Sequence, residues 1–219
     1  MKMKKISMLF IACLAFMTSC NIDNYDEPTG TISGGIYDIE THELIPAQSP
    51  NGARVQIVQE GYYQPINFWC KPDGSFENTR VFPGKYKLSV QGPFVTSTAT
   101  VQDVSIPCSN VKVMIEPNLR ITASAKLSGN KLEIDYEVHQ SSKSTGTVGS
   151  VILLCGNTIG LSVTTSNKRV EISTTDQPLG QKHHCVLEGI DTRNSVFVRV
   201  AAKTTETSYY NYSTLLKLK

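Results

Sequence analysis

The feature that most constrains the fold of this chain is a series of short segments in which apolar and polar residues alternate. Tyr86, Leu88 and Val90 are apolar at every second position, and residues 196–200 repeat the pattern. Alternation with a period of two places one set of side chains on one face of a β-strand. Glycine or proline separates the segments, and no helical period extends over a useful length. The sequence therefore predicts an all-β protein.

The first group of segments predicts a β-sandwich over residues 30–117. Asp73-Gly74 is a strong hairpin signal, because glycine accepts the positive φ of a tight turn. Pro117-Asn118 marks the expected domain boundary, since proline ends the preceding strand. Strands are expected near residues 31–39, 53–59, 68–71, 75–76, 86–90, 98–106 and 111–115.

Residues 118–219 predict a second β-sandwich. A turn at Ser128-Gly129-Asn130 separates two cleanly alternating segments, which is typical of an antiparallel hairpin with one buried face. Short strands at this spacing fit an immunoglobulin-like sandwich. They are expected near residues 119–125, 132–136, 149–155, 161–165, 170–173, 184–187, 196–200 and 215–218. The fold class is thus two tandem β-sandwich domains.

Residues 1–19 have the order of a secretory signal peptide. Lys2, Lys4 and Lys5 precede an apolar run over 6–16, and Thr18-Ser19 precedes Cys20. The run is too short to cross a bilayer core of about 30 Å as a helix that rises about 1.5 Å per residue. We therefore expect cleavage in front of Cys20. The alternative is an ordinary signal peptide with a chance cysteine at its end.

Residues 20–29 are polar and acidic and predict a short flexible tether. The whole chain has 21 Lys and Arg against 19 Asp and Glu, and the signal peptide removes three lysines and no acid, which leaves 18 against 19. A near-neutral mature chain gives no reason to expect nucleic acid as a partner, because that binding needs a clustered basic surface.

Four cysteines remain besides Cys20 and Cys13, which leaves with the signal peptide. They are Cys70, Cys108, Cys155 and Cys185. An exported chain passes through an oxidising compartment, and two cysteines in each domain allow the bridges Cys70–Cys108 and Cys155–Cys185. Buried free thiols are the alternative.

The residues around Cys20 resemble a bacterial lipobox, in which the cysteine sulfur receives diacylglycerol. Met17 stands where that motif usually has leucine. Several acyl chains anchor a protein firmly where one does not. The acidic stretch after Cys20 resembles the export signal that sends lipoproteins of Bacteroidota to the outer face of the outer membrane. A solvated linker that carries no export signal is the alternative.

Both domains resemble known families. Gly34–Asp38, Gly52–Val55, Asp73–Phe76 and Pro83–Leu88 are similar to motifs of the carboxypeptidase regulatory-like, transthyretin-related sandwich. That family usually has glycine where this chain has His42, so a wider turn is expected there. Residues 187–202 resemble the last third of a fibronectin type III domain, with Val196 in place of its corner tyrosine, and the generic immunoglobulin-like description fits better.

The order of signal peptide, tether and two sandwiches resembles a family of two-domain lipoproteins without an assigned activity. Its members are typically encoded beside the outer-membrane transporters and glycan-binding lipoproteins of polysaccharide-utilisation systems. The resemblance implies a lipid-anchored outer-membrane protein, exposed at the cell surface, that assists polysaccharide uptake.

No catalytic constellation is found in the sequence, so we expect a protein that is not an enzyme and holds no cofactor or metal. The only histidines are His42, His139, His183 and His184. Adjacent histidines on a strand point to opposite faces, so His183 and His184 cannot easily share a metal. Asp38 and Glu40 share a strand face and are expected to be solvated.

A glycan-binding role is the sharper hypothesis, because sugars stack their apolar C–H faces on aromatic rings. The best candidate patch is Tyr62, Tyr63 and Trp69. Phe68 and Trp69 point to opposite faces of a strand, so one of them is expected in the core. Tyr209, Tyr210 and Tyr212 are expected to pack in a hairpin. The alternative function is a structural or docking subunit that binds an outer-membrane transporter or another protein without binding glycan.

Overall fold

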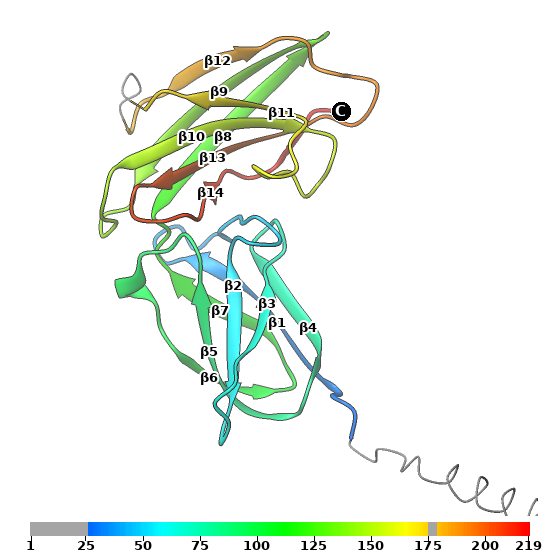
Figure 1. Cartoon of the computed structure of the whole chain (residues 1–219), viewed down its shortest axis with the longest axis vertical. Helices are drawn as coiled ribbons and strands as arrows, with labels where there is room; N and C mark the ends of the chain where they lie inside the picture. Colours follow the sequence, from blue (N-terminus) through cyan, green and yellow to red (C-terminus); the bar gives the residue numbers. More distant parts are fainter. Residues whose placement is uncertain (1–25, 175–178) are drawn as a thin grey trace, which may run out of the picture.

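The computed structural model describes residues 26–174 and 179–219. The signal peptide, Cys20 and the first residues of the tether, all inferred from the sequence, lie outside this part of the chain. The described chain is all-β, as predicted, and forms two sandwiches stacked end to end (Figure 1). One hydrophobic core is built from residues between Ile32 and Ile115, and the main core of the other from residues between Leu119 and Ala202.

The first sandwich has two sheets. The first sheet has the strand order β4-β1-β7, with β1 and β7 parallel, and the second has the order β3-β2-β5-β6. A short 3-10 helix, Thr96–Thr98, lies between β5 and β6. The strands are β1 Gly30–Asp38, β2 Arg54–Gln59, β3 Ile66–Trp69, β4 Ser75–Val81, β5 Gly84–Gln91, β6 Gln102–Ile106 and β7 Cys108–Ile115.

The second sandwich also has two sheets. One has the order β12-β9-β8, and the other has the order β11-β10-β13-β14, with β15 also paired to β13. This arrangement is consistent with the immunoglobulin-like expectation. The strands are β8 Leu119–Ser128, β9 Lys131–Gln140, β10 Val148–Gly156, β11 Lys168–Ile172, β12 His183–Leu187, β13 Phe197–Thr204, β14 Asn211–Tyr212 and β15 Leu216–Lys217.

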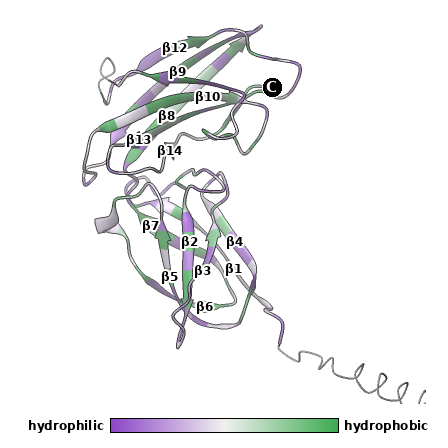
Figure 2. Ribbon diagram, in the orientation of Figure 1, coloured by the Kyte–Doolittle hydropathy of each residue, from purple (hydrophilic) through white to green (hydrophobic). Residues whose placement is uncertain are grey.

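Hydrophilic and hydrophobic residues alternate along several of these strands, such as β2, β5 and β9. Figure 2 shows both kinds of residue along β2. In β2 the inward residues Val55 and Ile57 are fully buried, and Gln56 between them points outward. The core of each sandwich thus lies between its two sheets, as the alternation in the sequence predicts.

Two local predictions were wrong. Asp73-Gly74 does form a turn, with Gly74 at φ 90°, but β3 and β4 belong to different sheets, so the turn connects the sheets and is not a hairpin. Residues 161–165 are not a strand. The Ser162 carbonyl accepts hydrogen bonds from the backbone N–H groups of Thr165 and Ser166, which closes a turn.

His42 itself adopts the left-handed conformation that glycine favours, with φ 60°. The backbone N–H of His42 donates to the Asp38 carbonyl at 2.9 Å, and the N–H of Asp38 donates to the Glu43 carbonyl at 2.9 Å. The turn therefore closes without glycine, at the cost of a strained histidine.

All four cysteines of the described domains are free thiols, so the two bridges considered from the sequence are absent. Cys70 follows β3 and Cys108 begins β7, and these strands lie in different sheets of the first sandwich. Cys155 on β10 and Cys185 on β12 likewise lie in different sheets of the second sandwich. Cys70 and Cys155 are buried in the cores, as the free-thiol alternative expects.

A buried arginine joins the two sandwiches. Arg199 on β13 is only 1% exposed and lies over the Tyr212 ring at 4.5 Å. Its guanidinium donates to the Ala47 and Pro72 carbonyls of the first sandwich, at 3.0 and 2.9 Å. It also donates to the Ser213 and Leu161 carbonyls of its own sandwich, at 2.9 and 3.3 Å. One side chain of the second domain is therefore held by the backbone of both.

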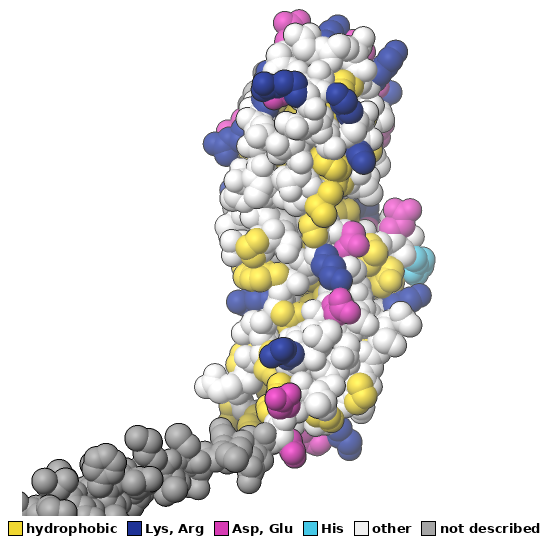
Figure 3. All heavy atoms as spheres, turned by 90° about the vertical axis from the view of Figure 1, so that its right-hand side faces the viewer, with side chains coloured by type: hydrophobic (Ala, Val, Ile, Leu, Met, Phe, Trp, Pro, Cys, Tyr) yellow, Lys and Arg dark blue, Asp and Glu magenta, His cyan; other side chains and the backbone are white. Residues whose placement is uncertain are grey.

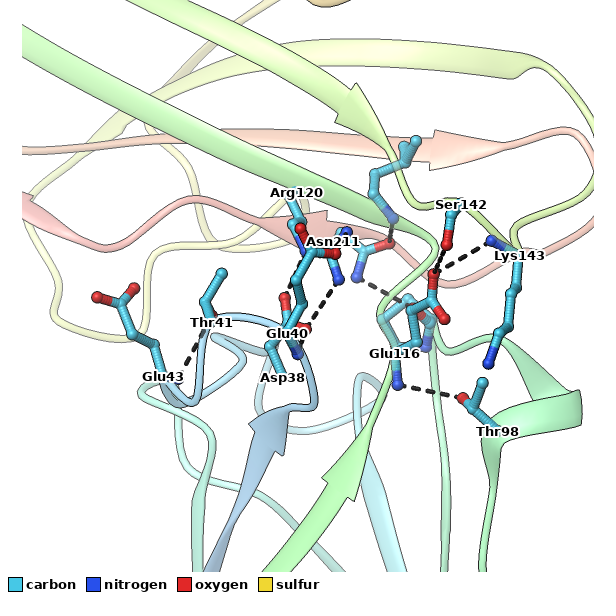
Figure 4. A network of polar contacts seen from close by, with 12 residues as sticks. Asp38, Glu40, Thr41, Glu43, Thr98, Glu116, Arg120, Ser142, Lys143 and Asn211 are labelled. Atoms are coloured by element: carbon cyan, nitrogen blue, oxygen red, sulfur yellow. Dashed lines mark hydrogen bonds and ion pairs between the residues drawn. The ribbon is translucent and has the colours of Figure 1, made fainter.

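A second contact between the sandwiches corrects the expectation that Asp38 and Glu40 are merely solvated. Asp38, at the end of β1, is 4% exposed and receives two hydrogen bonds from Arg120 of β8, at 2.6 and 2.8 Å (Figure 4). Arg120 also pairs with Glu40 at 3.0 Å. Burial acts to raise the pKa of Asp38, but hydrogen bonds from Arg120 and from backbone N–H groups outweigh it and lower the pKa.

Candidate functional site

The outer face of the β3-β2-β5-β6 sheet carries an aromatic ring beside a row of polar side chains. We call this face the Trp69 platform and define it by Trp69, Arg54, Gln91, Gln56 and Asn67. The strand pairing brings them together, because Arg54 lies opposite both Trp69 and Gln91, and Gln56 lies opposite Asn67.

Strand alternation explains why these side chains point outward. Phe68 packs against the core of the first sandwich and contacts Phe76 edge-on, with ring centroids 6.0 Å apart. Its neighbours Asn67 and Trp69 therefore point to the other face. The sequence left open whether Phe68 or Trp69 is the core residue, and the structure places Phe68 there, with Trp69 half-buried on the outer face.

Hydrogen bonds connect the polar side chains of the platform. Arg54 Nη2 donates to Gln91 Oε1, Gln91 Nε2 donates to Gln56 Oε1 at 2.8 Å, and Gln56 Nε2 donates to Asn67 Oδ1 at 2.8 Å. The chain of bonds crosses three strands from Gln91 on β5 to Asn67 on β3. Each member is fixed by its neighbour, which gives the face ordered donors and acceptors before any ligand arrives.

Arg54 also stacks on Trp69, with the guanidinium carbon 5.8 Å from the ring centroid. This contact is in the range of a cation–π interaction. The ring and the guanidinium therefore support each other on the outer face.

Tyr62 and Tyr63 do not join Trp69. They lie in the loop between β2 and β3, and their side chains are 65% and 96% exposed. Trp69 is at the far end of β3, at least about 10 Å away at the rise of an extended strand. Tyr62 instead lines a separate groove of about 550 Å³ on the same sheet, together with Lys85, Lys87 and Asp103. The predicted patch is thus divided into two ends of one face.

The second aromatic cluster packs as expected in part. Tyr212 is 3% exposed, and its hydroxyl donates to Gln48 Oε1 of the first sandwich at 2.8 Å. The Tyr210 ring lies 6.4 Å from the Tyr212 ring. Tyr212 therefore belongs to the domain junction, and Tyr210 packs beside it.

The histidines on β12 point to opposite faces. His184 Nδ1 lies 2.7 Å from Asp135 Oδ1, whereas the His183 ring lies 5.6 Å from the Tyr136 ring. Within residues 26–174 and 179–219, no three His, Cys, Asp or Glu side chains gather closely enough to hold a metal ion. In the same part of the chain, no helix has the length and apolar character needed to cross a membrane.

The domain junction is flanked by a second concave surface. A groove of about 650 Å³ is lined mainly by apolar residues of both sandwiches, with Lys71, Glu43 and Asp73 at its edge. Figure 3 shows hydrophobic side chains near the middle of the molecule, beside basic and acidic ones. Ile159, which lines this groove, is 70% exposed. The apolar lining residues are Leu44, Pro46, Pro72, Ile159 and Leu215.

Comparison with known proteins gives a family match for the first domain. Residues 30–117 match the model described as the N-terminal domain of a protein of unknown function, DUF3823. The comparison with curated proteins found no match.

Solved structures share the fold of the whole described chain. A DUF3823 family protein from Bacteroides uniformis has a TM-score of 0.71 at 19% identity, over 87% of this chain and 99% of its own. One from Parabacteroides merdae has a TM-score of 0.73 at 17% identity, over 89% and 100%. A third structure, from Bacteroides uniformis, is named a "putative carbohydrate binding protein" and has a TM-score of 0.72 at 14% identity, over 88% and 99%. This chain therefore has a first domain that matches the DUF3823 N-terminal domain, within a two-sandwich fold shared with proteins of that family.

Proposed function

We propose that this chain is a non-catalytic, lipid-anchored member of the DUF3823 family that binds polysaccharide through the Trp69 platform. The observation that carries the proposal is one open sheet face on which the only tryptophan lies beside a hydrogen-bonded row of amide and guanidinium groups. A sugar ring offers an apolar face that stacks on an indole and hydroxyls that bond to amides. The platform offers both kinds of partner.

The platform is suited to binding and not to bond cleavage. Its side chains are an indole, a guanidinium and three amides, and none of them is a nucleophile or a proton donor and acceptor near neutral pH. The structural neighbour that is named a "putative carbohydrate binding protein" also supports a binding role.

The expected anchor would place this face close to the outer membrane. The tether residues 20–29 lead into β1, which begins at the end of the first sandwich far from the second (Figure 1). A lipidated Cys20 would thus hold the proposed glycan-binding domain nearest to the membrane. Incorporation of labelled palmitate into the full-length chain, and its loss in Cys20→Ser, tests the anchor. Protease treatment of intact cells tests exposure at the cell surface.

Measurement of glycan affinity in matched variants tests the binding role. Trp69→Ala should lower the affinity for a bound polysaccharide by about tenfold or more, because it removes the stacking surface. Tyr63→Ala is the control, since Tyr63 is a highly exposed aromatic residue away from the platform. Equal affinities of the two variants and the wild type would remove the platform as the site. The melting temperature of Trp69→Ala must stay near that of the wild type for the comparison to hold.

The second candidate function is docking to an outer-membrane transporter without glycan binding. The observation that favours it is the apolar groove at the domain junction, where Ile159 is 70% exposed. Exposed apolar surface of this kind often marks a protein contact. Co-purification of a transporter that is lost in Ile159→Ser, with no signal on a glycan array, would favour this function over the first.

A further inference from the structure

Arg54 is a cation without an acidic partner. No carboxylate of the described residues lies within 4 Å of its guanidinium, although nine ion pairs involve other residues. Its closest contacts on the platform are the Gln91 amide and the Trp69 ring, both of which are uncharged. The positive charge of Arg54 is therefore held in place by uncharged groups, without a carboxylate of the described residues to neutralise it.

Arg54 has N–H donors that no acceptor of the described residues engages. Nη2 is engaged by Gln91, and Nε is buried without a hydrogen-bond partner. Nη1 has no acceptor among the described residues, and Gln91, which accepts from the adjacent Nη2, is exposed. A planar carboxylate matches the paired N–H groups of a guanidinium better than a single hydroxyl does.

A second unpaired cation lies at the other end of the same face. Lys85 is exposed on β5 and makes no ion pair in the described part of the chain, whereas the neighbouring Lys87 pairs with Asp103 at 3.1 Å. Gln91, opposite Arg54, is six residues further along β5 than Lys85. Arg54 and Lys85 are therefore separated by roughly 20 Å along the sheet.

We propose that the Trp69 platform selects acidic polysaccharides, with one sugar carboxylate bound to Arg54, a second near Lys85, and a sugar ring stacked on Trp69. This inference rests on the glycan-binding function proposed above and adds the class of glycan. A neutral sugar would need only the ring and the amides. Two unpaired positive charges on one face fit a polymer that repeats its own negative charge.

The test compares polymers that differ only in charge. Binding of the purified full-length protein is measured by calorimetry with polygalacturonate, alginate and their carboxyl-reduced, neutral forms. We expect at least one acidic polymer to bind about tenfold more tightly than its reduced form at low salt, and added salt to narrow the difference. Arg54→Met should remove most of that preference, and Lys85→Met part of it.

Matched variants separate this inference from the function on which it rests. Lys112→Met is the control, because Lys112 is an exposed lysine on β7 of the other sheet. Trp69→Ala should weaken both the acidic and the neutral polymer. Equal affinity for acidic and reduced forms, or an unchanged preference in Arg54→Met, would overturn the selection of acidic glycans and leave glycan binding in place. If neither these polymers nor a wider panel of neutral glycans binds, both proposals are wrong.

Discussion

Replacement of Arg199 by methionine tests whether the two sandwiches form one cooperative unit. Arg199 donates four hydrogen bonds to backbone carbonyls, two in each sandwich, and is only 1% exposed. Burial lowers the pKa of Arg199 to about 10, so the guanidinium is still charged at neutral pH. Methionine replaces the aliphatic part of the arginine side chain and has no donor, so it leaves these carbonyls without their charged partner.

The expected loss of folding stability in Arg199→Met follows from these four hydrogen bonds. Hydrogen bonds to charged groups contribute about 1.5–3 kcal/mol each, and relief from burying an unpaired charge offsets part of the sum, so we expect a net loss of about 3–5 kcal/mol. For a chain of this size 1 kcal/mol corresponds to about 2–4 °C, which gives a fall in Tm of about 6–20 °C. Because two acceptors lie in each domain, the variant should also unfold in two separate transitions.

Differential scanning calorimetry measures both effects. The matched control is Arg169→Met, since Arg169 is an exposed arginine of the same sandwich for which no ion pair is found in the described chain. Arg199→Lys should lose less stability than Arg199→Met, because it keeps the charge and up to three donors. A Tm of Arg199→Met within about 2 °C of the wild type, with one unchanged transition, would refute the reasoning.

Three further predictions concern pH, backbone strain and thiol chemistry. The pKa of Asp38 is below its ordinary value of 3.8, so its contact with Arg120 stabilises the fold above that pH and is lost as the pH falls through the lowered pKa. Urea titrations should therefore show the full difference in stability between wild type and Asp38→Asn at pH 7. This difference should disappear below about pH 4. In the same titrations, Gly74→Ala should lower the stability by more than about 2 kcal/mol, because φ is 90° there and the added Cβ would lie 2.2 Å from the Ile45 carbonyl oxygen. Gly129→Ala is the control: its φ is also positive but the space around it is open, so the loss should be about 1 kcal/mol. Equal losses would show that the close approach of Ile45 does not matter. Burial, together with the charge of Asp73, raises the pKa of Cys70 to about 12. Alkylation followed by mass spectrometry should therefore modify Cys70 only after unfolding, and the unfolded chain should show all four thiols alkylated without added reductant. Rapid labelling of native Cys70 would be inconsistent with its burial.

The sequence predicted the strands well where alternation alone determines the structure. The apolar residues of β2 and β5 that point into the core could be identified directly, because each strand has one buried face. The structure of segment 161–165 could not be identified in this way, because its apolar residues pack from a turn: Leu161 is fully buried against side chains of β10 and β13. β14 was missed because it is only two residues long, Asn211–Tyr212.

The candidate site could be predicted only in part. Trp69 was identified as a candidate by its residue type, but its outward direction depends on which face of β3 meets the core. The amides of the platform come from three strands, and polar residues at alternate positions carry no signal of their hydrogen bonds. Arg199 and Asp38 were missed as junction residues, because their partners lie 152 and 82 residues away in the chain.

The central claim is that the Trp69 platform contacts glycan, and the fluorescence of Trp69 tests it most directly. Trp69 is the only tryptophan of the chain, so its emission reports on this face alone. Titration with a polysaccharide that binds by calorimetry should change the intensity or wavelength of tryptophan emission, with a midpoint equal to the calorimetric Kd. Saturable binding with no change in tryptophan emission would place the glycan elsewhere and contradict the account.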